Sequence, residues 1–186
     1  MLKKLCSFVA TMALTASIAQ AAPVDSGDRK DFQVFKDVAK SVERYTQFTI
    51  FDDVSASVTD GVVTLTGKVT MPYKRDDIAK RVGKVDGVRE VHNQMTVLPV
   101  SQFDEELRYR IARSIYNNSN FWNYAIMANP PIHIVVEHGR VTLTGVVQSE
   151  VDRMLARSLA TQFGAFSVTN ALKTDAEVSA ALEKSE

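Results

Sequence analysis

A ten-residue motif that occurs twice constrains the fold of this chain more than any other feature. The stretch DGVVTLTGKV at positions 60–69 returns 78 positions later as HGRVTLTGVV at positions 138–147, with most positions identical. A shorter match follows at nearly the same spacing, with residues 87–93 matching residues 164–170. Two matches at one spacing indicate that a structural unit is repeated. The sequence therefore predicts two copies of one small module.

The repeated motif has the pattern of a β-hairpin. Asp60-Gly61 and His138-Gly139 are two-residue turn sequences, in which glycine accepts the positive φ that such turns require. These turns place one apolar set on one face of each hairpin, through the pairs Val58–Val63, Ala56–Leu65, Val54–Gly67, Val136–Val141, Ile134–Leu143 and Ile132–Gly145. A shift by one residue would reverse every side chain, so the agreement between the copies predicts the register. Gly67 and Gly145 are accordingly assigned a structural role.

Helical patterns precede and follow each hairpin. The expected elements are helices over about 32–45, 72–84, 104–117 and 150–163, and third strands over about 88–98 and 167–173. In the helix at 150–163, Val151, Leu155 and Leu159 are expected on the core side, and Ser149 is the expected N-cap. Both halves then read αββαβ. The predicted fold class is α+β, each module being a small three-stranded mixed sheet with two helices packed on one face.

The module boundaries follow from the repeat. The first module is expected at 22–98 and the second at 102–175, with a short linker at 99–101 in which proline ends a strand. Residues 176–186 form a C-terminal tail, for which we expect a frayed helix.

The N-terminal 21 residues have the pattern of a secretory signal peptide. Lys3 and Lys4 precede the apolar run Leu5–Ile18, and Ala19-Gln20-Ala21 provides small residues for cleavage after Ala21. The run falls short of the roughly 20 apolar residues that span a bilayer. Cleavage would also remove Cys6, the single cysteine, so neither disulfides nor thiolate metal sites are expected in the exported protein.

Charge and motif content argue against nucleic-acid binding and catalysis. Without Lys3 and Lys4, 20 basic residues remain against 22 acidic ones, which leaves no general attraction for nucleic acid. The three histidines have no metal-ligand spacing, and His138 occupies the turn position that Asp60 holds in the first copy. No nucleophile elbow or phosphate-binding loop is present. We therefore expect no enzyme activity, cofactor or metal.

The repeat carries a family resemblance. A hairpin reading G-x-V-T-L-T-G, an amphipathic helix and then G-V-x-x-V-x-N resembles the BON domain, a small module of bacterial envelope proteins. Tandem copies behind a signal peptide are similar to the osmotically inducible periplasmic proteins of that family. The resemblance implies a non-catalytic periplasmic protein that associates with phospholipid or other envelope components. The chain departs from the pattern at Ala165-Phe166 and by a short insertion before the second hairpin.

That insertion, within residues 116–127, is the first candidate contact site. Phe121, Trp122 and Tyr124 have rings that favour a bilayer interface, and Arg110 and Arg113 on the preceding helix could meet lipid phosphates. The alternative, which we favour, is that the three rings cover the junction between the modules. Whether the insertion is exposed is left open by the sequence.

A second candidate is the set of basic residues on the helix at 72–84. It comprises Lys74, Arg75, Lys80, Arg81 and Lys84. We expect them to form an ordinary solvated face. Asn93 and Asn170 recur at one position, and side-chain hydrogen bonds to the backbone are expected to explain them.

The sequence thus favours an exported, envelope-associated binding protein. The leading hypothesis is contact with anionic phospholipid in support of envelope integrity or osmotic stress tolerance. Its main rival is a protein-binding or chaperone-like periplasmic factor without lipid contact. A third hypothesis is a small-ligand carrier that uses a cleft between the modules. The sequence names neither a lipid, a partner nor an oligomeric state.

Overall fold

A computed structural model describes residues 26–183, so the predicted signal peptide lies outside the described residues. The first module contains α1 (Ser26–Glu43), β1 (Asp53–Thr59), β2 (Val62–Val69), α2 (Pro72–Val82), β3 (Glu90–Asn93) and β4 (Thr96–Val97). The second contains α3 (Gln102–Tyr116), η1 (Ser119–Phe121), α4 (Trp122–Ala125), β5 (Ile132–Glu137), β6 (Arg140–Val147), α5 (Glu150–Ala160), η2 (Thr161–Phe163), β7 (Ser167–Asn170) and β8 (Lys173–Thr174). A last helix, α6 (Asp175–Glu183), follows. The α+β class and the αββαβ order of both modules are confirmed.

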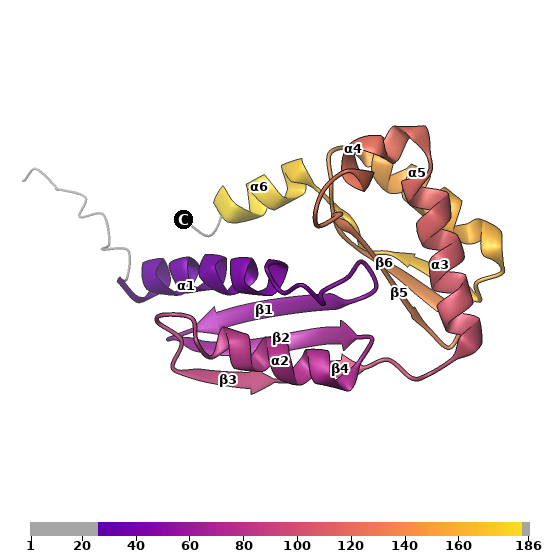
Figure 1. The fold of residues 1–186 in the computed structure, drawn as a ribbon. Coiled ribbons are helices and arrows are strands. Elements are labelled where there is room, and N and C mark those ends of the chain that lie inside the picture. Colours follow the sequence, from indigo (N-terminus) through magenta and orange to yellow (C-terminus); the bar gives the residue numbers. More distant parts are fainter. Residues whose placement is uncertain (1–25, 184–186) are drawn as a thin grey trace, which may run out of the picture.

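Each module is a small mixed sheet covered by helices on one face (Figure 1). In the first, β2 pairs antiparallel with β1 and parallel with β3 and β4; in the second, β6 has the same relation to β5, β7 and β8. The predicted register is confirmed in both hairpins, for example in the pairs Val58–Val63 and Ile134–Leu143. In the described part of the chain, no helix is long and apolar enough to cross a membrane.

The two turns have the predicted conformation. Asp60 and His138 have φ of 50° and 52°, and the glycines that follow them have φ of 74° and 71°. Positive φ at both central residues defines a type I′ turn, whose twist suits a two-residue hairpin. The prediction that His138 is a turn residue is therefore confirmed.

An aspartate from the first helix of each module binds each turn. The Asp31 carboxylate accepts hydrogen bonds from the amides of Asp60 and Gly61, at 2.6 and 2.9 Å. Asp104 accepts them from His138 and Gly139, at 2.8 and 2.7 Å. The carboxylate thereby fixes the helix to the end of the hairpin. This repeated contact is not evident from the repeat, because the insertion changes the offset between the two aspartates.

Replacing Asp104 with alanine is expected to lower the free energy of unfolding by about 2 kcal/mol, because hydrogen bonds to a charged group are strong and buried amides would be left unpaired. Asp104 is 1% exposed. The matched variant Asp31→Ala should cost less, about 1 kcal/mol, because water can reach the turn of the first module. Urea unfolding followed by circular dichroism measures both. Equal losses for the two variants would contradict this explanation.

The third strand of each module is interrupted, which corrects the continuous strands expected at 88–98 and 167–173. Asn93 donates to the carbonyl of Arg75 at 3.1 Å, and Asn170 donates to that of Arg153 at 2.8 Å. Each asparagine also accepts from the amide two residues later. The expectation that these side chains bond to the backbone is confirmed. The step in the strand brings Met95 and Leu172 into the cores.

The core side of α5 differs from the prediction. Val151 is 66% exposed, whereas Ala156 and Ala160 are fully buried and Leu155 and Leu159 lie at the edge of the core. Small residues at the centre of the contact let the helix approach its neighbours closely. The Ser149 N-cap is confirmed, since its hydroxyl accepts from the amide of Asp152.

The C-terminal tail contains a helix, as expected, but this helix starts at Asp175 and its first turn is capped rather than frayed. Thr174 and Glu177 form a capping box, with the Thr174 hydroxyl accepting from the Glu177 amide at 3.3 Å and the Glu177 carboxylate accepting from the Thr174 amide at 2.9 Å. Glu177 also pairs with Arg153 of α5 at 2.9 Å. These contacts fix α6 to the second module.

The loop at 44–52 joins the modules by docking on the free edge of β5. The carbonyl of Ile50 accepts from the amide of Ile134 at 2.7 Å, and the carbonyl of Asp52 lies 2.6 Å from Nδ1 of His133. Ile50 and Phe51 pack against the core of the second module. The main-chain hydrogen bond fixes where along β5 the loop lies as well as how far the loop is from that strand.

Candidate binding surfaces

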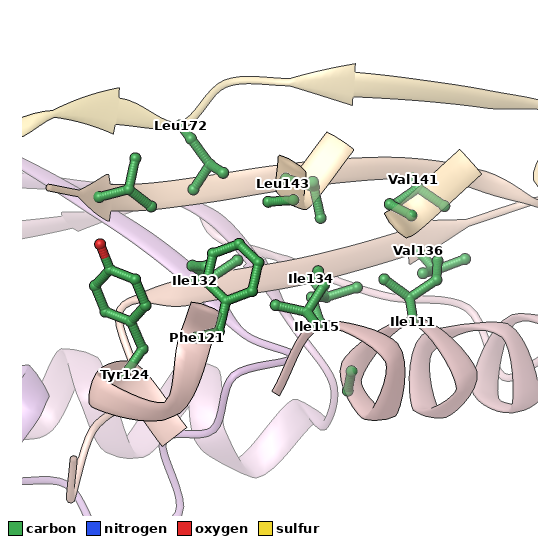
Figure 2. Packing of buried hydrophobic residues seen from close by; sticks show 14 of the residues in the cluster. Ile111, Ile115, Phe121, Tyr124, Ile132, Ile134, Val136, Val141, Leu143 and Leu172 are labelled. Atoms are coloured by element: carbon green, nitrogen blue, oxygen red, sulfur yellow. The ribbon is translucent and has the colours of Figure 1, made fainter. Parts of the chain in front are cut away.

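The aromatic insertion is divided between the core and the surface of the second module. Phe121 is fully buried and Tyr124 is 5% exposed, and both rings pack in the core beside Ile132 and Leu172 (Figure 2). The expectation that these rings cover the junction between the modules is therefore wrong. Neither ring is available for lipid contact, because the core of their own module buries them.

The Tyr124 hydroxyl also has a structural task. It accepts a hydrogen bond from the amide of Gln148 at 2.8 Å and donates one to the Asp152 carboxylate at 3.0 Å. Burial is the main reason that the pKa of Tyr124 is raised, and the neighbouring Asp152 adds to the effect. The bond to Asp152 holds α4 against the first turn of α5.

Trp122 lies on the opposite side of α4 and is 65% exposed. Ile126 and Met127, which directly follow this short helix, are also exposed. Val151 and Met154 are exposed apolar residues on the first turns of α5, against which Tyr124 holds α4. We call these five residues the Trp122 patch. Large exposed apolar side chains on two segments that are joined by a hydrogen bond are typical of a contact surface.

The two arginines predicted to accompany the rings lie on the exposed side of α3. Arg110 pairs with Glu106 at 3.2 Å, one helical turn away, and Arg113 is in the last turn of the helix. Both are accessible, and α3 leads through η1 directly into the helix that carries Trp122. The structure thus leaves Trp122, Arg110 and Arg113 at the surface and removes Phe121 and Tyr124 from the candidate site.

Lys74 does not belong to the solvated face of α2, which corrects the grouping of the five basic residues. Its ammonium lies 2.7 Å from the Asp52 carboxylate, and the two side chains are 6% and 0% exposed. Thr49 and Thr70 each donate to Asp52 through amide and hydroxyl groups. We call these four residues the Asp52 cluster. The signal was available, because Lys74 lies four and eight residues before Ile78 and Val82, the core positions of α2.

The remaining basic residues of α2 and the histidines offer little for a site. Lys80, Arg81 and Lys84 are exposed, as expected for a solvated face. His92 pairs with Glu90 at the surface, at 3.0 Å. Among residues 26–183, no group of three or more His, Cys, Asp or Glu residues could hold a metal ion.

The fold defines a protein built from two copies of one small α+β module. The BON domain model matches residues 31–99 and again residues 104–176, so the chain belongs to the BON domain family. This confirms the resemblance inferred from the repeated motifs.

Known proteins that resemble this chain match only part of it. The potassium binding protein Kbp of Escherichia coli is 28% identical over 106 residues, which cover 52% of this chain and 71% of that protein. Two structures of CdsD, a structural protein of the type III secretion system of Chlamydia trachomatis, are 12% identical, with TM-scores of 0.31 and 0.30. The alignments cover 76% and 81% of this chain and 65% and 97% of the CdsD chains, so the first spans less than two thirds of its match.

Proposed function

We propose that this protein is a non-enzymatic, exported binding protein that attaches to anionic phospholipid of the bacterial envelope through the Trp122 patch. The observation that carries the proposal is the exposure of Trp122 on a helix whose neighbouring rings, Phe121 and Tyr124, are buried. Attachment at this surface would place the protein at the periplasmic side of a membrane. Support of envelope integrity or osmotic stress tolerance is the role we propose for it there.

The chemistry of the patch supports an interfacial contact. An indole ring is apolar but keeps one N–H donor, so it favours the boundary between headgroups and acyl chains. Ile126 and Met127, which follow α4 in the chain, supply further exposed apolar area, and Val151 and Met154 supply more on α5. Tyr124 and Phe121 anchor α4 to the core of the module. The helix is therefore already ordered before binding, which lowers the entropy cost of contact with a membrane.

Basic residues close to the patch support a preference for anionic lipid. Arg110 and Arg113 are exposed on α3, and each cation near an anionic surface contributes about 1 kcal/mol. Glu106 offsets part of this attraction through its ion pair with Arg110. The expected contact is therefore reversible and sensitive to salt.

The test is co-sedimentation of the purified protein with vesicles that contain an anionic phospholipid. Trp122→Ala is expected to lower the binding constant for these vesicles about tenfold, because one large side chain would no longer be buried on binding. Because Trp122 is the single tryptophan, its fluorescence should also shift to the blue when the wild-type protein meets these vesicles. Neutral vesicles should bind more weakly.

The matched control is Phe166→Ala, which removes an exposed ring from another part of the same module. Phe166 is 78% exposed and stacks on Phe103, with ring centroids 6.3 Å apart. This variant should bind vesicles as the wild type does. Absence of binding, or binding equally unaffected by Trp122→Ala and by high salt, would reject the lipid proposal in favour of the protein-binding rival.

A further inference from the structure

A polar cleft lies where the first module overhangs the open face of the second sheet. Its volume is about 330 Å³, and the residues that matter for its chemistry are Asp53, Lys68, Glu137, Arg140, Thr142 and Thr169. Asp53 and Lys68 come from β1 and β2, whereas the other four come from β5, β6 and β7. This volume is at the lower end of small-molecule sites in proteins. Any ligand held there would contact both modules.

Charges of alternating sign form a row across the cleft. Asp53 is the cross-strand partner of Lys68, and Glu137 is the cross-strand partner of Arg140. Lys68 and Glu137 form an ion pair that links the modules, and their side chains are 39% and 36% exposed. The row therefore runs negative, positive, negative, positive, with its two middle members in reach of solvent.

Each of these four charged residues occurs in only one of the two copies of the repeat. The repeat spacing of 78 places Pro131 and Val146 at the positions of Asp53 and Lys68, and it places Thr59 and Val62 at those of Glu137 and Arg140. None of the four has a charged counterpart in the other copy. The fold of the module does not require these charges, since each copy forms the same sheet without those of the other. Two of the four, Lys68 and Glu137, meet only because the two modules lie side by side.

We propose that this cleft binds a small zwitterion that carries one carboxylate and one ammonium group. The lining carries two cations and two anions beside His138, so the cleft has no strong preference for a simple ion of either sign. A lone metal cation would meet the repulsion of Lys68 and Arg140. A zwitterion satisfies both signs at once. Its carboxylate contacts Lys68 or Arg140, its ammonium contacts Glu137 or Asp53, and the hydroxyls of Thr142 and Thr169 offer further hydrogen bonds.

Binding would exchange one ion pair for two. The Lys68–Glu137 pair is partly exposed, and such pairs contribute little to stability, so a ligand can replace each partner at small cost. The ligand then bridges residues of both modules. The ligand site therefore lies at the junction between the modules and shares no residue with the Trp122 patch. Failure of lipid binding would not affect this proposal, and the reverse also holds.

Isothermal titration of the purified protein with a series of ω-amino acids, from glycine to 6-aminohexanoate, tests the proposal. At least one member should bind saturably, whereas acetate, methylammonium and potassium chloride at the same ionic strength should not. Arg140→Gln is expected to weaken that binding at least tenfold. Arg140 is exposed at the end of β6, so this variant should fold normally.

Two further variants separate the site from general effects. Lys68→Gln should also weaken binding at least tenfold, and Arg157→Gln, on the exposed side of α5, should leave it unchanged. No saturable binding by any member of the series would overturn the proposal. So would binding that Arg140→Gln and Lys68→Gln leave intact, or binding that potassium chloride or acetate reproduces. Vesicle binding should be the same in all three variants.

Discussion

Replacing Asp52 with alanine is expected to destabilise the protein by about 3–5 kcal/mol, because it leaves the Lys74 ammonium buried without its counter-ion. Asp52 is fully buried and receives hydrogen bonds from Lys74 at 2.7 Å and from Thr49 and Thr70. All of these donors would lose their acceptor together. Since whole domains are stable by only about 5–15 kcal/mol, the loss would be a large part of the total. Urea unfolding followed by circular dichroism measures it.

Two variants distinguish a buried charge cluster from a surface ion pair. Asp76→Ala removes a carboxylate from the exposed side of α2, where Asp76 contacts Arg75 at 3.2 Å, and should change the stability by less than about 0.5 kcal/mol. Adding Lys74→Met to Asp52→Ala should restore part of the lost stability, because it removes the unpaired charge. If the single variant costs no more than Asp76→Ala, the Asp52 cluster is not important for folding.

The same cluster predicts a loss of stability in acid. Burial alone would raise the pKa of Asp52, but the hydrogen bonds from Lys74, Thr70 and Thr49 outweigh burial and lower the pKa below its ordinary value of 3.8. A carboxyl whose pKa is lowered by folding stabilises the folded state fully above the unfolded value, and this contribution disappears as the pH falls through the folded pKa. The stability difference between the wild type and Asp52→Asn should therefore be constant above pH 5 and shrink below about pH 4.

The cluster also connects the first module to the second. The Asp52 side chain lies at the centre of the Asp52 cluster, while its main-chain carbonyl lies 2.6 Å from Nδ1 of His133. Two residues earlier, the carbonyl of Ile50 accepts from the amide of Ile134 on β5. In the second module Pro130, Gln148 and Asp152 stand at the positions of Asp52, Thr70 and Lys74. Tyr124 bonds to Gln148 and Asp152 there. The Tyr124 hydroxyl, from the aromatic insertion, thus bonds to the residues at two of these positions, where the first module has the contacts of Asp52 with Thr70 and Lys74.

Much of the fold could be predicted because it depends on local patterns. Alternating polarity and the turns at Asp60-Gly61 and His138-Gly139 fix which residues pair and which face is buried. The helices could be predicted from apolar spacing, but the exposure of Val151 could not. A helix packed on small residues such as Ala156 and Ala160 has its core side at positions where a hydropathy pattern shows little contrast.

The candidate site was harder to predict because it depends on contacts between distant segments. Phe121 and Trp122 are adjacent in sequence, yet one is fully buried and the other is 65% exposed. A helix of four residues is too short to show a period that would separate them. Asp52 and Lys74 meet across 22 positions, and a sequence pattern alone does not show which charged residues will be paired inside. The charge row in the cleft likewise exists only once both modules are docked.

Replacing Gly145 with alanine is expected to cost more than about 3 kcal/mol, by combining an unfavourable backbone angle with a steric overlap. Gly145 has a φ of 114°, and a Cβ placed on it would overlap the carbonyl oxygen of Pro131 on the neighbouring strand segment. Since both groups are main chain in a paired sheet, neither can move aside without breaking the pairing of β5 and β6. Gly67 has the same φ and the same kind of contact, with Asp53.

Two other glycines separate the two causes. Gly164 has a φ of 78° with no atom within 4 Å of a Cβ, so Gly164→Ala should cost only the backbone term, about 1 kcal/mol. Gly83 has a φ of −64° and its nearest neighbour would lie 3.5 Å away, so Gly83→Ala should be neutral or slightly stabilising. Thermal unfolding of the three variants should rank them in this order. If Gly145→Ala costs no more than Gly164→Ala, the close approach of Pro131 does not constrain the hairpin, and the conserved spacing of glycine between the two copies needs another explanation.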